Sequence, residues 1–468
     1  MQSSKSMMAV AAFLILLPVF IFFNVPYINN DAIVIITFII NAILFSSGIL
    51  FELKKYSFSL NLIYWIFMYF FMFLAPFIQY TNNKYPLDYA IENPNNDELF
   101  LCNITILFFS IAWILGGFIK KKSQQTKINS YITTGYESSY NKKYYVLFFI
   151  SLIFALYALY SNGIMGIFSS QSEAYKKFYS GNNQSLSLII NISLPAMLTF
   201  SVFSYFSVVK TERKHFLVAT LCLICLIICF FPTTISRYMA ATIYIGLLIL
   251  LIPKMHKGTL FFWIFVLGLF IVFPFLNLFR YNTDISMMVF FSDLKNNFLV
   301  SYTEGHYDAY MSLIMTFRYI AEQGCTFGRQ VIGGILFFIP RSIWPNKPIG
   351  SGAMMINYFS PGSFSNVSCT LIAECLLNFG WVSIIIVPII LGRWLTKLDF
   401  NYHSIKIQRD SLGTTPYIFL ISLIFFLLRG DFMSSFAYTF GFMLVGYIIK
   451  IFLKKRVGTN YNFIRFKD

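Results

Sequence analysis

Charged side chains are scarce in this chain of 468 residues, where Asp, Glu, Lys and Arg together make up 12%. Water-soluble domains average about 25% charged residues, so the composition excludes an ordinary soluble protein. Hydrophobic residues account for 57% of the chain and aromatic residues for 20%. The sequence therefore predicts a membrane protein.

Several familiar functional motifs are also missing. The chain contains no G-x-x-x-x-G-K-[ST] phosphate loop and no H-E-x-x-H zinc motif. Its outer loops hold no D-x-D sequence, which would indicate a metal-dependent transferase. The net charge of +16 resides in short loops between apolar runs and not in a basic tract interleaved with aromatic residues, which argues against nucleic-acid binding.

Long apolar runs dominate what is present. A membrane-spanning helix needs about 20 predominantly apolar residues. Twelve runs approach that length, at residues 7–25, 32–51, 58–79, 99–119, 144–160, 185–209, 216–232, 238–252, 259–279, 379–395, 415–430 and 433–453. We predict an all-α polytopic integral membrane protein with about 12 transmembrane helices, forming a single membrane domain over residues 1–468.

Lys and Arg lie mostly on one side of these predicted helices, as at Lys54, Lys120, Arg393 and Lys450. Basic residues in short loops are retained on the cytoplasmic side of a membrane. With twelve helices both termini share a side, so we predict that both are cytoplasmic.

The largest segment on the opposite face is the outer loop over residues 280–378. Asp308 to Glu322 has the apolar spacing of one helical face. Val331 to Ile339 is too short to cross a bilayer and ends at a proline, as an interfacial helix would. Thr370 to Asn378 is a helical lead-in to the tenth span. The loop is thus predicted to be partly helical and to carry the functional site.

Helix breakers and polar groups concentrate between Gly328 and Gly380. Pro340, Pro345 and Pro348 prevent a continuous spanning helix there. The segment FIPRSIWPNKPIGSG, followed by FSNVSCTLIAECLLNFG, closely resembles segments of the oligosaccharide repeat-unit polymerases, the O-antigen polymerase type of bacterial integral membrane protein. The sequence GHYDAY, at Gly305 to Tyr310, is also similar.

The resemblance implies a glycosyltransferase of the bacterial inner membrane, with a GT-C-like architecture and a periplasmic outer loop. Such an enzyme polymerises undecaprenyl-diphosphate-linked oligosaccharide repeat units into O-antigen or capsule. It implies a chain-length regulator and a flippase as partners, alongside membrane lipid. The donor is already activated by its diphosphate leaving group, so we expect no cofactor and a metal-independent reaction.

Four arginines are predicted to lie at one depth on the outer face: Arg237, Arg280, Arg341 and Arg429. A guanidinium group stays charged and binds oxyanions through a bidentate fork, so the set predicts an anion site. With the resemblance, the anion is a lipid-linked diphosphate. The alternative is that these residues are interface anchors, or partners of Asp431 and phospholipid headgroups.

A sugar hydroxyl that attacks an anomeric carbon needs a group that accepts its proton. Asp308 and Glu374 are the candidates, because both stand in stretches similar to the family, and Arg341 completes the predicted catalytic set. Nearby Glu304 and His306 are more simply interpreted as a solvated loop. The sequence does not choose between the two carboxylates.

Five more residues of the outer loop carry groups that suit sugar recognition: Trp344, Lys347, Asn366, Ser368 and Asn378. The polar ones can equally brace the loop, and tryptophan also anchors proteins at membrane interfaces.

Two other functions fit the same composition. A polysaccharide ligase would use the same donor but a different acceptor. A lipid-linked oligosaccharide flippase, which is not an enzyme, would also need many helices, although the polar groups concentrate on one face instead of at mid-membrane.

Overall fold

The computed structural model describes residues 4–24, 29, 31–118, 142–166, 184–208, 213–272, 300–363, 367–405 and 411–453. Every regular element in these ranges is helical, which confirms the all-α prediction for this part of the chain. A helix lies at each of the twelve predicted positions. Eight of the helices described are long and apolar enough to cross a membrane.

These eight are α1 (Ser4–Asn24), α2 (Ala32–Lys55), the continuous helix of α3 (Leu60–Tyr69), η1 (Phe70–Leu74) and α4 (Ala75–Asn82), α5 (Asn96–Phe118), α7 (Lys143–Gly166), the continuous helix of α9 (Gln184–Leu188), η2 (Ile189–Ser193) and α10 (Leu194–Val208), α20 (Trp381–Ile405) and α22 (Phe432–Leu453). The other four positions hold α11 (Arg213–Cys229), α12 (Arg237–Leu251), α13 (Leu260–Leu267) with η4 (Gly268–Val272), and α21 (Ser411–Arg429).

The helix formed by α3, η1 and α4 is the buried centre of the bundle. Its first turn is fixed by Asp399 of α20, which accepts hydrogen bonds from the backbone N–H groups of Leu60 and Asn61 at 2.8 and 3.2 Å. Ser59 caps the same turn through its hydroxyl. A carboxylate at a helix N-terminus satisfies otherwise unpaired donors, so this contact locks α20 to the central helix.

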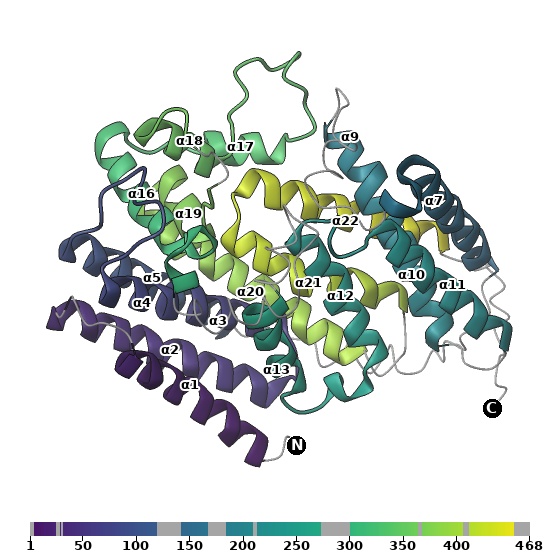
Figure 1. Cartoon of the computed structure of the whole chain (residues 1–468), viewed down its shortest axis with the longest axis horizontal. Coiled ribbons are helices and arrows are strands. Elements are labelled where there is room, and N and C mark those ends of the chain that lie inside the picture. The colour runs from purple at the N-terminus through teal and green to yellow at the C-terminus, as the bar shows by residue number, and fades with distance from the viewer. Residues whose placement is uncertain are drawn as a thin grey trace, which may run out of the picture.

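Within the residues of the outer loop that the structure describes, the α-helices are α16 (Ala309–Gln323), α17 (Arg329–Ile335), α18 (Ser351–Phe359) and α19 (Leu371–Phe379). Figure 1 shows α16, α18 and α19 gathered at the upper left, beyond the ends of α4 and α5, with α17 beside the start of α22. The helices predicted over 308–322 and 370–378 are confirmed. The one predicted over 331–339 is α17, which ends earlier, at Ile335.

Arg318 ties this loop to the membrane bundle. Its Nε and Nη2 atoms donate to the two carboxylate oxygens of Glu98 at 2.6 and 2.8 Å, and Nη1 donates to the carbonyl of Glu92 at 2.9 Å. The fork geometry of the guanidinium group matches a carboxylate in this bidentate way. The pair therefore fixes α16 against the start of α5.

We expect Arg318→Ala to lower the stability of the purified protein by about 1 to 3 kcal/mol, because a charged, bidentate hydrogen-bonded pair is lost. The melting temperature in detergent measures the change. Arg329→Ala is the matched control, since Arg329 is exposed and its side chain donates to the carbonyl of Asn346 at 3.2 Å. Equal melting temperatures for the two variants would contradict this role.

Candidate functional site

The turn formed by Gly305, His306, Tyr307 and Asp308 is held rigidly against the central helix. Gln79 of α4 donates from Nε2 to the carbonyls of Tyr302 and Tyr307, at 2.8 and 3.1 Å. The Tyr307 ring stacks on Phe71 of η1, with ring centroids 5.0 Å apart. We call these four residues the Gly305–Asp308 turn.

Asp308 joins this turn to two distant segments. Its carboxylate accepts hydrogen bonds from the backbone N–H and the hydroxyl of Ser368, at 3.0 and 2.7 Å. Arg429, the last residue of α21, donates from Nη2 to Asp308 Oδ1 at 3.0 Å and lies 3.5 Å from the carbonyl of Gly305. Asp308 is 3% exposed. The hydrogen bonds from Ser368 bring GHYDAY into contact with FSNVSCTLIAECLLNFG, two of the segments that resemble the polymerase family.

Arg237 contacts the same turn. It is the first residue of α12, and both of its terminal nitrogens lie 3.4 Å from Nδ1 of His306. The next residue, Tyr238, stacks on Phe426 of α21 with ring centroids 4.1 Å apart. The pairing of α12 with α21 thus sets Arg237 and Arg429 around one turn.

The positive charges of both arginines act on the side chain of Tyr307, within the turn. Burial raises the pKa of the Tyr307 hydroxyl to about 12, while the positive charges of Arg429 and Arg237 act to lower it. The Arg429 guanidinium carbon also lies 6.0 Å from the centre of the Phe71 ring. Two guanidinium groups at one rigid turn form an environment that favours an anionic ligand.

Glu374 is a second buried carboxylate, and it contacts the first turn of α22. It is 4% exposed, and its carboxylate accepts from the Phe432 backbone N–H at 2.9 Å and from Asn378 Nδ2 at 3.2 Å. Burial raises the pKa of the Glu374 carboxyl to about 7; the charge of Asp431 adds to this rise, and the hydrogen bonds oppose it. Glu374 therefore changes protonation state near neutral pH.

The segment that ends at Asp431 connects the surroundings of Asp308 with those of Glu374. The residues Arg429, Gly430 and Asp431 link α21 to α22, so one short turn contacts Asp308 at its start and approaches Glu374 at its end. Asp431 also packs against Gly350, where an added Cβ would lie 2.1 Å from Asp431 Oδ2. A side chain at residue 350 would displace this turn.

Arg341 and Lys347 brace the proline-rich segment on the surface. Arg341 is exposed and donates to the carbonyls of Lys347 and Pro348 at 2.7 and 3.2 Å. Lys347 donates from Nζ to the carbonyls of Phe337 and Ile339 at 2.7 and 3.0 Å. Burial, with the neighbouring charge of Arg341, lowers the pKa of Lys347. These contacts account for a folded segment after α17, and a ligand role for Arg341 and Lys347 stays a prediction.

The remaining predicted residues fall into three groups. Ser368 and Asn378 have bracing partners, Asp308 for the first and Glu374 with Thr326 for the second. Trp344 is half-buried. Arg280 and Asn366 lie outside the residues that the structure describes.

Sequence reasoning missed two of the residues that build this site. The sequence suggests that His306 belongs to a solvated loop, whereas its ring is half-buried and contacts Arg237. The similarity of GHYDAY to the family was the available signal. Gln79 lies in an apolar run, and the sequence pattern assigns it no role. A buried amide in a predicted span is nevertheless costly unless it has a specific partner.

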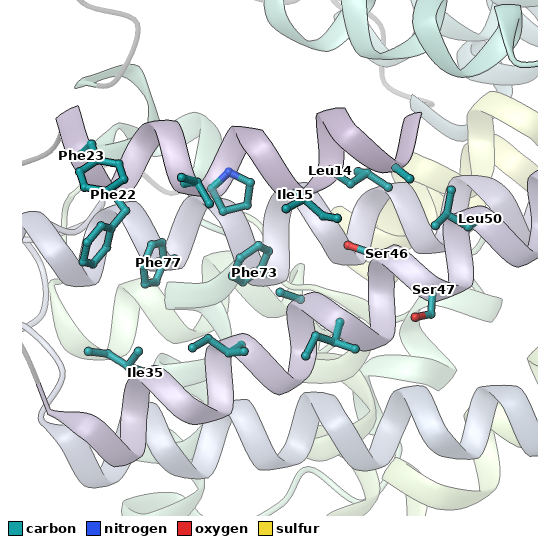
Figure 2. A pocket seen from close by; sticks show the side chains of 16 residues that line it. Leu14, Ile15, Phe22, Phe23, Ile35, Ser46, Ser47, Leu50, Phe73 and Phe77 are labelled. Carbon is teal, nitrogen blue, oxygen red and sulfur yellow. The ribbon is translucent and has the colours of Figure 1, made fainter. Parts of the chain in front are cut away.

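An apolar groove of about 580 Å³ lies between α1 and α2, with Phe73 and Phe77 of the central helix on its wall. Figure 2 shows its lining of aliphatic and aromatic side chains, in which Ser46 and Ser47 are the labelled polar residues. No charged side chain lines the groove. It can accept hydrocarbon but has no cationic side chain in its lining to bind a diphosphate.

Comparison with known proteins agrees with the resemblance. The family model described as O-antigen polysaccharide polymerase Wzy matches residues 7–462 of this chain, well beyond the pieces that carried the resemblance. No curated protein and no solved structure matches the chain.

Proposed function

Because the chain belongs to the O-antigen polysaccharide polymerase Wzy family, we propose that it joins undecaprenyl-diphosphate-linked oligosaccharide repeat units into a surface polysaccharide. The observation that carries this proposal is the convergence of Arg237 and Arg429 on the rigid Gly305–Asp308 turn. A diphosphate leaving group needs such a cationic site, and its lipid tail fits a protein whose helices are apolar.

In the proposed reaction, a hydroxyl oxygen of the acceptor glycan forms a bond to the anomeric carbon of the donor glycan. The bond between that carbon and the diphosphate oxygen breaks, and undecaprenyl diphosphate leaves with the electron pair. Arg237 and Arg429 stabilise the charge that develops on the leaving group. The growing chain is thereby transferred to the incoming unit, and the product stays linked to lipid.

We assign different roles to the two buried carboxylates. Asp308 holds Arg429 in place, because its negative charge is paired with that guanidinium group. Glu374 accepts the proton of the attacking hydroxyl, since its pKa of about 7 suits a general base at neutral pH. Arg280 and Arg341 are proposed to extend the diphosphate site, and Trp344, Lys347, Asn366, Ser368 and Asn378 to contact or support the glycan.

The proposed topology has twelve membrane spans, both termini in the cytoplasm and the outer loop of residues 280–378 in the periplasm. Its support is the distribution of basic residues, which favours one face. A GT-C-like arrangement follows from the resemblance, as do the partnerships with a flippase and a chain-length regulator. The site then faces the side on which flipped repeat units arrive.

Deleting the gene and separating the surface polysaccharide of the host by size tests this function. We expect the ladder of chain lengths to collapse to a single repeat unit and to be restored by the wild-type gene. Loss of all surface glycan with repeat units held inside the membrane would indicate a flippase. Lipid-linked polymer that never reaches its final acceptor would indicate a ligase, and an unchanged ladder would contradict all three functions.

A further inference from the structure

Asn378 of α19 presents its side-chain amide to Glu374 in one fixed orientation. Its Nδ2 atom donates to the backbone carbonyl of Glu374 at 2.8 Å. A carbonyl oxygen only accepts hydrogen bonds, so the nitrogen of the amide must face it. The other end of the amide agrees, because Asn378 Oδ1 accepts from the hydroxyl of Thr326 at 3.1 Å. The second hydrogen of Nδ2 is then available to Glu374 Oε2, which lies 3.2 Å away.

The backbone around Asn378 is held as firmly as its side chain. The Asn378 carbonyl accepts from the N–H of Gly328 at 3.2 Å, and the carbonyl of Leu377 accepts from the N–H of Thr326 at 2.8 Å. Asn378 is 0% exposed. A buried amide in such a network cannot rotate without leaving several polar groups unpaired. The contact with Glu374 Oε2 is therefore built into the fold.

Two neutral donors thus hold the two oxygens of one carboxylate. The backbone N–H of Phe432, in the first turn of α22, donates to Glu374 Oε1 at 2.9 Å, and Asn378 donates to Oε2 from within α19. A contact at each oxygen fixes the plane of the carboxylate. Amide donors keep their hydrogens near neutral pH, and hydrogen bonds to the charged form favour ionisation.

The surroundings of Glu374 otherwise disfavour ionisation. Burial raises the pKa of Glu374, and the negative charge of Asp431, in the link between α21 and α22, adds to the rise. Cys369, before α19, and Cys375, in α19, also interact with Glu374. Burial raises the pKa of both thiols, so they stay neutral near pH 7. The hydrogen-bond donors therefore oppose both burial and a neighbouring charge.

We propose that Asn378 is a positioning residue for proton transfer in the polymerase, because its amide orients the Glu374 carboxylate and stabilises its ionised form. This inference rests on the proposed function, in which Glu374 accepts the proton of the attacking hydroxyl. It gives Asn378 a task beyond support of the glycan. The alternative is that Asn378 only ties the end of α19 to the segment at Thr326.

Two variants remove the donor to Glu374, and a third is the matched control. Asn378→Leu keeps the approximate volume of the side chain without its polar atoms. Asn378→Ser ends one bond short of Nδ2, and it serves if the leucine variant does not fold. Thr326→Val removes the hydroxyl at the far end of the same amide, while the carbonyl of Glu374 still fixes the amide's orientation. Melting temperatures in detergent verify folding.

The measurement is the titration of Glu374 in the purified full-length protein. Infrared difference spectra follow the C=O band of its protonated carboxyl group, which Glu374→Gln identifies by removing it. We expect the Asn378 variants to raise the midpoint by about 0.5 to 1 pH unit, because the charged carboxylate loses a donor. Thr326→Val should stay within about 0.2 pH unit of wild type. The pH dependence of polymerisation should shift with the midpoint, measured on lipid-linked repeat units extracted from a host that lacks the gene.

Each alternative result contradicts a different part of the proposal. An unchanged midpoint in folded Asn378 variants, or an equal shift in Thr326→Val, would overturn the role of Asn378 while leaving the proposed function intact. A raised midpoint that the pH dependence of polymerisation does not follow would show that Glu374 is not the proton acceptor, and the positioning role would fail with it. If the wild-type protein does not join these repeat units, the proposed function itself is overturned.

Discussion

Arg429→Ala is expected to abolish polymer formation, with unit transfer at least about 100-fold slower than in wild type. The substitution removes one of the two guanidinium groups that face the Gly305–Asp308 turn. Loss of a single donor to a developing oxyanion typically costs a factor of about 10² to 10³ in rate. A host that depends on this variant should display single repeat units in place of a ladder.

A second variant distinguishes ligand binding from structural support. Arg429→Ala also leaves Asp308 as a buried carboxylate without its ion-pair partner, which costs about 3 to 5 kcal/mol in comparable pairs. Adding Asp308→Asn removes that unpaired charge. If Arg429 binds the diphosphate, the double variant regains stability but not polymerisation.

The outcome that contradicts the proposal is recovery of polymer in the double variant. Arg429 would then serve only to neutralise Asp308. Arg429→Lys adds a graded comparison, since it keeps the charge but loses the planar fork, and we expect partial activity at best. Arg329→Ala, which changes an exposed arginine of α17, should leave the ladder intact.

The fold could be predicted from the sequence to the extent that it depends on local pattern. Apolar runs marked the helices because the bilayer requires a minimum length of hydrocarbon-compatible chain. The local sequence pattern also predicted helices over residues 308–322 and 370–378, and both are helices in the structure. Where the pattern was interrupted the prediction was less accurate, as for α17, which ends at Ile335.

The site could not be assembled in the same way. Asp308 contacts Ser368 and Arg429, which are 60 and 121 residues away along the chain. No local pattern specifies that pairing, because it depends on how α16, α21 and the segment before α19 pack. Residue chemistry did select Arg237 and Arg429 as candidates, and the resemblance to the family selected Asp308 and Glu374. Their grouping, and the contact between His306 and Arg237, needed the tertiary structure.

Glu374→Gln is expected to lower polymerisation and raise stability together. Wild-type activity should increase as the pH rises through about 7, because the proton acceptor must be ionised and the pKa of Glu374 is about 7. Glutamine cannot accept the proton, so the rate should fall by about 10² to 10⁴ and lose this pH dependence. Its amide oxygen still accepts from the backbone N–H of Phe432, so the first turn of α22 is preserved.

The effect on stability has the opposite sign. An unfolded glutamate loses its proton near the ordinary pKa of 4.5, whereas folded Glu374 keeps its proton up to about 7. The unfolded state therefore binds fewer protons in this interval, and wild-type stability declines as the pH rises from about 4.5 to 7, by on the order of 3 kcal/mol. Glutamine does not ionise, so the variant does not lose stability over this pH interval through residue 374. The melting temperature of Glu374→Gln should exceed that of wild type at pH 8, and the advantage should shrink toward pH 5.

Opposite changes in rate and stability would distinguish a buried base from a bracing residue, whose replacement lowers both. Glu322→Gln is the matched control, because Glu322 is exposed and accepts from the Tyr358 hydroxyl at 2.8 Å. Asp308→Asn should reduce the rate without removing the rise near pH 7, since Asp308 acts through Arg429. If Glu374→Gln retains wild-type activity while Asp308→Asn abolishes polymerisation, the proton acceptor is Asp308, and Glu374 only anchors the start of α22.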